Sequence, residues 1–181
     1  MRHYLLLAVF LPIAASAQSG RRGRDPNSVP GGYSATGAPS APEPVVAPDV
    51  PVLEGLPHAV RVGYTVYVSG MVPLDSAGHL VGAGDVASQA RQAVRNLASV
   101  MRAARGVPGD VVRATIYLRD LTAEKVAAAR DAVLDGLDRA APPALTVVGV
   151  SSLTEPGIEV MVDATGQLRS EFPDRSRIRK P

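Results

Sequence analysis

Residues 85–120, DVASQARQAVRNLASVMRAARGVPGDVVRATIYLRD, contain the two patterns that decide the fold. Apolar residues recur every three or four positions from Val86 to Ala104, which predicts an amphipathic helix with Asp85 as its N-cap and an end near Gly106. Residues 111–120 then alternate between apolar and polar side chains, which is typical of a strand. This stretch therefore predicts a helix that leads directly into a strand of the same domain.

The segments on both sides extend this pattern into a complete α+β domain. The other predicted elements are two strands over residues 59–68 with a tight turn at 62–64, a loop over 74–84, a helix over 123–139, and strands over 145–150 and 158–165. The order is β-β-α-β-α-β-β, which predicts a sheet with two helices on one face. A domain of this size leaves its second sheet face uncovered, so we expect the chain to form oligomers.

Both ends of the chain differ in composition from this domain. A basic opening, the apolar run YLLLAVFLPIAA and a small-residue site at 15–17 predict a signal peptide over residues 1–17, cleaved near Ala17, and export to the periplasm or the medium. The alternative is an N-terminal membrane anchor, but the run is shorter than the roughly 20 residues that a span needs. Residues 18–51 predict a Pro/Gly/Ser-rich flexible linker, and 169–181 predict a basic disordered tail. Residues 52–168 remain as the folded domain.

The composition excludes several kinds of chemistry. The chain has no cysteine, so it can form neither a disulfide nor a thiolate metal site. Its three histidines are isolated in sequence, and GxSxG, P-loop and GxGxxG motifs are absent, so we expect no metal and no cofactor. No later segment is apolar enough to predict a membrane span.

The charge pattern argues against nucleic-acid binding. Aromatic residues make up 4% of the chain, and residues 52–168 contain slightly more acidic than basic residues. One row of arginines lies on the polar face of the first predicted helix: Arg91, Arg95, Arg102 and Arg105. Such a row is typical of a solvated helix face, and anion binding is the alternative.

Three segments together resemble the RidA family, also called the YjgF/YER057c/UK114 family. They are VSG at 68–70, QARQAVRNL at 89–97 and DVVRATIYLRDL at 110–121, and the similarity covers about residues 55–166. The resemblance implies a chorismate-mutase-like fold and a homotrimer with a central barrel and pockets at the subunit interfaces. It also implies a cofactor-independent enamine/imine deaminase activity, which releases ammonia from substrates such as 2-iminobutanoate.

The resemblance also marks positions where this chain departs from the family's site. In the family motif P-A-R-[ST] the arginine grips the substrate carboxylate, whereas here Leu145 precedes Thr146. Met161 takes the place of the carboxylate that positions water in the last strand. Glu159 lies two positions earlier, on the same expected strand face, and is a weak candidate for a substitute base.

The remaining pocket positions implied by the resemblance change in the same direction. Met71 follows Ser69-Gly70 where the family has glutamine, and Leu56 falls near the family's pocket tyrosine. Arg61 is a candidate for a substitute anion contact, although an exposed strand residue is the simpler interpretation. Because polar groups have become leucine or methionine, the sequence predicts an apolar interface pocket, either closed by its own side chains or open to a small molecule.

Three functional hypotheses follow from the sequence. The leading one is an exported RidA-like protein that binds a small apolar or neutral molecule and is weak or inactive as a 2-imino acid deaminase. The first alternative is a divergent enamine/imine deaminase whose substrate lacks a carboxylate. The second is a protein-interaction or chaperone-like role that uses the two flexible ends of the chain.

Overall fold

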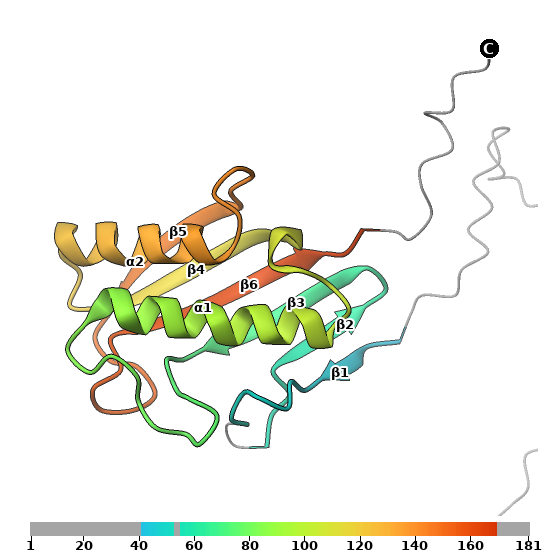
Figure 1. Ribbon diagram of the computed structural model, residues 1–181, viewed down its shortest axis with the longest axis horizontal. Helices are drawn as coiled ribbons and strands as arrows, with labels where there is room; N and C mark the ends of the chain where they lie inside the picture. Colours follow the sequence, from blue (N-terminus) through green and yellow to red (C-terminus); the bar gives the residue numbers. More distant parts are fainter. Residues whose placement is uncertain (1–40, 53–54, 170–181) are drawn as a thin grey trace, which may run out of the picture. The chain divides into compact units, whose positions relative to one another are not determined.

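The polypeptide between Glu43 and Gln167 folds into one mixed sheet with two helices on one of its faces (Figure 1). This computed structural model describes residues 41–52 and 55–169. The strands are β1 (Glu43–Val45), β2 (Ala59–Val62), β3 (Thr65–Met71), β4 (Val111–Arg119), β5 (Ala144–Val150) and β6 (Val160–Gln167). The helices are α1 (Val86–Ala103) and α2 (Ala123–Gly136), with a short 3-10 turn at Pro108–Asp110.

The strand order across the sheet is β1-β2-β3-β6-β4-β5. Only β4 and β5 pair in parallel, because α2 connects them as a crossover, and the other neighbours are antiparallel. The predicted α+β fold with two helices on one face is confirmed, with one further strand at the N-terminal side. The predicted signal peptide, residues 18–40 of the predicted linker and residues 170–181 of the predicted tail lie outside the described residues.

The linker prediction is wrong for its last residues. Glu43–Val45 form the edge strand β1, which pairs with β2, and the side chains of Ala47 and Val50 are buried in the core. Pro44 lies within this strand, and proline is tolerated there because an edge strand needs hydrogen bonds on one side only. The folded unit therefore begins before residue 52.

Helix α1 supplies the centre of the core. The side chain of Asp85 accepts a hydrogen bond from the Ser88 N–H at 3.2 Å, which confirms the predicted N-cap. The buried apolar face of α1 packs against the sheet at Val66, Ile116 and Val162, all with no exposed surface. Two polar residues, Gln89 and Asn96, are also buried on α1.

The sheet face opposite the helices is open. Tyr67 on β3 is 55% exposed between the buried Val66 and Val68, and Val148 on β5 is 37% exposed. On the same face the Tyr117 hydroxyl donates to the Asp163 carboxylate at 2.8 Å. This hydrogen bond, helped by burial, raises the pKa of Tyr117 above its ordinary value of 10.0.

Candidate functional site

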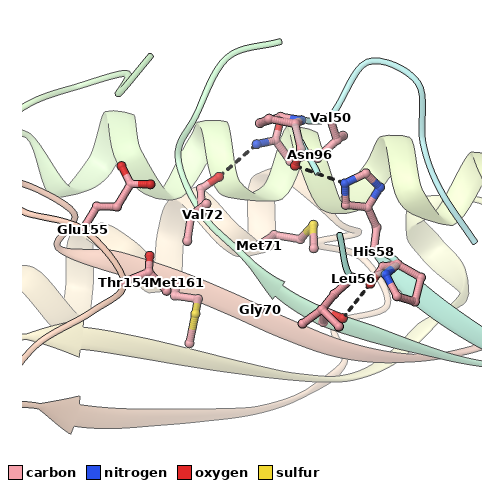
Figure 2. Close-up of a pocket in the computed structure, with 13 residues that line it drawn as sticks. Val50, Leu56, His58, Gly70, Met71, Val72, Asn96, Thr154, Glu155 and Met161 are labelled. Atoms are coloured by element: carbon pink, nitrogen blue, oxygen red, sulfur yellow. Dashed lines mark hydrogen bonds between the residues drawn. The ribbon is translucent and has the colours of Figure 1, made fainter. Parts of the chain in front are cut away.

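A cavity of about 370 Å³ lies where β3, the segment before β2 and the loop before β6 meet (Figure 2). Its volume is within the range typical of small-molecule pockets. Its wall is formed by Val50, Pro51, Leu56, Pro57, His58, Ser69, Gly70, Met71, Val72, Asn96, Thr154, Glu155 and Met161. Most of these side chains are apolar, and two are methionines.

His58 fixes one wall of the cavity through both ring nitrogens. The backbone N–H of Ala47 can only donate, so Nδ1 of His58 accepts this hydrogen bond at 3.0 Å and carries no proton. Nε2 is therefore protonated and donates to the Pro51 carbonyl at 3.1 Å. His58 is 4% exposed, and its two bonds tie residues 47–51 to the start of β2. Its role in the described structure is thus to position the wall.

Asn96 of α1 ties the segment after β3 to this helix. Its amide donates to the carbonyls of Val72 and Leu74, both at 2.9 Å, while its oxygen accepts from Gln92 at 3.0 Å. The carbonyl of Val72 is the contact drawn in Figure 2. Because both amide hydrogens are engaged, Asn96 shapes the cavity and has no donor left for a ligand.

Gly70 allows Met161 to form the floor. A Cβ at Gly70 would lie 2.5 Å from Sδ of Met161, closer than real atoms approach. Met161 also packs with Val72, Leu74 and Ile158, an apolar cluster separate from the main core. The missing side chain at Gly70 therefore makes room for a flexible thioether beside the cavity.

The cavity offers little charge. Among the described wall residues Glu155 is the one carboxylate, and none is lysine or arginine. The Ser69 hydroxyl donates to the Pro57 carbonyl at 3.2 Å. Since His58, Asn96 and Ser69 are already engaged within the protein, the free wall surface is mainly apolar.

The structure brings together four of the seven residues predicted to form the pocket. Leu56, Ser69, Met71 and Met161 all lie in the cavity wall. Arg61 does not: its guanidinium pairs with Glu43 at 2.5 Å, away from the cavity.

The predicted pocket residues on β5 also lie elsewhere. Leu145 pairs in register with the buried Ala114 and packs against the main core on the helix side of the sheet. Thr146 is exposed, opposite Thr115. The segment that resembles the family's carboxylate grip is thus separate from the cavity formed within one chain.

Glu159 is committed to ion pairs. Its carboxylate lies 2.8 Å from Nζ of Lys125 and 3.7 Å from Arg119, and its side chain is 13% exposed. It does not line the cavity, so the prediction of a substitute base at Glu159 finds no support in this geometry.

Sequence reasoning missed several wall residues, including Asn96, Thr154 and Glu155. A signal for Asn96 was present, because it lies seven residues after Gln89 and both fall on the apolar face of α1. Thr154 and Glu155 had no such signal, since they belong to a turn that only tertiary packing brings to the cavity. Among the described residues no three potential metal ligands form a cluster, and no helix has the length and hydropathy of a membrane span.

The family model described as Endoribonuclease L-PSP matches residues 49–167. The chain belongs to this family, which includes the RidA and YjgF proteins. Protein DfrA of Myxococcus xanthus is 37% identical to this RidA-family chain over 105 residues, which cover 58% of the chain and 77% of that protein. The mouse 2-iminobutanoate/2-iminopropanoate deaminase is 43% identical over 65 residues, 35% of the chain and 47% of the relative. The chain spans about half the length of the first curated relatives, the archaeal RutC family proteins.

Solved structures agree with the RidA-family fold. RidA from an Antarctic Psychrobacter is 27% identical with a TM-score of 0.63, and the match covers 70% of this chain and 99% of that one. The YjgF gene product of E. coli is likewise 27% identical, with a TM-score of 0.62 over 70% of this chain and 99% of that one.

Proposed function

We propose that this RidA-family protein is exported, forms a homotrimer, and binds a small apolar or neutral molecule with little activity as a 2-imino acid deaminase. One observation carries the proposal: the wall of the cavity, as described, contains no cationic side chain. Its relatives in mouse, rat and human are named 2-iminobutanoate/2-iminopropanoate deaminases, and those substrates carry a carboxylate. An apolar wall offers that carboxylate no counter-charge.

The energetic consequence favours a substrate or ligand without a carboxylate. A hydrogen bond to a charged group is worth about 1.5–3 kcal/mol, which corresponds to roughly a ten- to hundredfold change in affinity. A missing water-positioning acid or base costs about another hundredfold in rate. In compensation, Leu56, Met71 and Met161 offer an apolar ligand the contact area that drives binding in small pockets.

The trimer proposal rests on the open sheet face. Tyr67 and Val148 are exposed there, whereas on the helix side Val66 and Val68 of β3 are buried and Val147 of β5 is half-buried. Burying such side chains against a second copy gains about 25 cal/mol for each Å² of apolar surface removed from water. Export rests on the N-terminal sequence pattern alone.

A second candidate function is hydrolysis of an imine that lacks a carboxylate. Glu155 favours it, because this carboxylate is the one acidic group in the described wall. It would stabilise a protonated imine, and it could accept a proton from water during hydrolysis. Such a substrate needs no arginine.

A binding titration tests the leading proposal. The neutral apolar probe N-phenyl-1-naphthylamine should gain fluorescence on binding the full chain, and Leu56→Ala should weaken binding about fivefold, because part of one apolar wall is lost. Leu121→Ala is the matched control, since Leu121 is exposed but lies outside the cavity wall. Equal loss in both variants, or no saturable binding, would contradict an apolar ligand site.

A further inference from the structure

A second hollow lies on the outer face of the helix layer, away from the cavity described above. It is a groove of about 370 Å³ between α1 and α2. Arg91, Arg95 and Arg102 from α1 form one wall, and Asp135 from α2 lies on the other. The helices cover one face of the sheet (Figure 1). Association through the opposite face would therefore leave the groove between the helices accessible.

Small residues create the groove. Gly136 of α2 lies so close to α1 that a Cβ there would collide with Cγ1 of Val94. Ala98 and Ala132, each 6% exposed, form the floor where larger side chains would fill the space. The two helices therefore leave a shallow channel with an apolar floor and a polar margin.

Among the described residues, none of the three wall arginines lies within ion-pair distance of a carboxylate, although the Asp85 N-cap is near enough to Arg91 for their charges to interact. Helix α1 contains no aspartate or glutamate. Within the described part of the chain, the guanidinium of Arg91 donates to Ser88 Oγ at 2.9 Å, Arg95 contacts Gln92 Oε1 at 3.5 Å, and neither is paired with a carboxylate. Arg91 and Arg95 are one helical turn apart, a spacing at which like charges repel. A bound anion would relieve this repulsion.

We propose that this groove binds an extended acidic peptide segment of a partner protein. The three arginines span about 16 Å along α1 at a rise of about 1.5 Å per residue. In an extended peptide, side chains at alternate positions lie about 7 Å apart on one side, so three acidic residues span about 13 Å. Flexible arginine side chains bridge that difference, and each planar guanidinium can hold a carboxylate by two hydrogen bonds.

The same wall residues favour a peptide over a nucleic acid. Neither α1 nor α2 contains an aromatic residue on which bases could stack. Asp135, which pairs with Arg139 at 2.6 Å, adds a carboxylate to the groove and disfavours a continuous row of phosphates more than a peptide whose acidic residues alternate with neutral ones. The chain's own ends do not supply the segment, because residues 18–40 and 170–181 contain more basic than acidic residues.

The test uses fluorescence anisotropy of the full chain with a labelled peptide that alternates glutamate and valine. Saturable binding should weaken as salt rises, and a peptide with glutamine in place of glutamate should bind at least about tenfold more weakly. The variant Arg95→Gln/Arg102→Gln should lose about five- to tenfold in affinity. Its control, Arg105→Gln/Arg130→Gln, removes the same charge outside the groove and should stay within about twofold.

A second variant separates groove shape from charge. Ala98→Met leaves every arginine in place and is a good helix former, but its side chain fills the floor of the groove. It should therefore also weaken binding of the peptide. Circular dichroism of each variant checks that the helices persist. Equal losses in the two arginine pairs, equal binding of the glutamine peptide, or tighter binding of a single-stranded oligonucleotide through the same arginines would each overturn the proposal.

Discussion

The side chain of Gln89 is the most informative single target in the fold. It has no exposed surface, and it joins three segments: its amide donates to Gly82 O at 3.2 Å and Gly157 O at 2.9 Å, and its oxygen accepts the Glu159 N–H at 2.8 Å. Gln89→Met keeps nearly the same side-chain volume, so the substitution loses little free energy by leaving a cavity. It leaves the N–H of Glu159 without its acceptor, which costs about 1–3 kcal/mol, and removes two further hydrogen bonds.

We therefore expect Gln89→Met to lower the free energy of unfolding by about 2–4 kcal/mol. Urea denaturation at a fixed protein concentration measures this change, and hydrogen exchange should show faster exchange of the Glu159 amide. Gln167→Met makes the same substitution at an exposed residue and should change stability by less than about 0.5 kcal/mol. If Gln89→Met also stays below about 0.5 kcal/mol, these hydrogen bonds do not hold the turn that carries Thr154 and Glu155.

Three further predictions concern the open sheet face and the helix cap. Tyr67→Asp places a charge on that face and should lower the molar mass measured by light scattering, whereas an unchanged mass would exclude the face as the interface. The pKa of Tyr117 is raised by Asp163, so the stability it contributes is present below pH 10.0 and lost as pH rises through the higher folded value. Tyr117→Phe should therefore show a flatter decline of stability in alkali, and equal slopes would contradict this. A hydrogen bond from the Ser88 hydroxyl lowers the pKa of Asp85. The stability that the Asp85 cap contributes is therefore present above pH 3.8 and is lost as pH falls through the lower folded value. Asp85→Ala should lower the melting temperature at pH 7 more than at pH 2, and an equal loss at both would refute the cap's charge dependence.

The elements that sequence predicts well are those whose local signals agree with their packing. Helix α1 combines an N-cap with apolar residues that recur every three or four positions, and the structure contains both the cap and the buried face. Strand β1 was not predicted, because its segment is rich in proline and too short to show an alternation of apolar and polar residues. It is ordered by pairing with β2 and by the two hydrogen bonds of His58, which are contacts that no local pattern contains.

The candidate site was only partly predictable for a similar reason. A family resemblance aligns positions along the chain, but it does not say which face of a strand each side chain occupies within one subunit. Leu145 was expected in the pocket and packs on the helix side of the sheet. Glu159 was expected on the same face as Met161, yet β6 begins at Val160, so strand alternation does not extend to it. Its carboxylate turns instead to Lys125.

The most direct test of the apolar-cavity proposal is hydrolysis of 2-iminobutanoate. The imine is generated in situ by an amino-acid oxidase, and ammonia release above the spontaneous rate is compared with that of the mouse 2-iminobutanoate/2-iminopropanoate deaminase. Without a cation in the described wall, we expect turnover at least about a hundredfold below that relative. Turnover within about tenfold of it would contradict the proposal and show that a carboxylate substrate is held by groups outside this cavity.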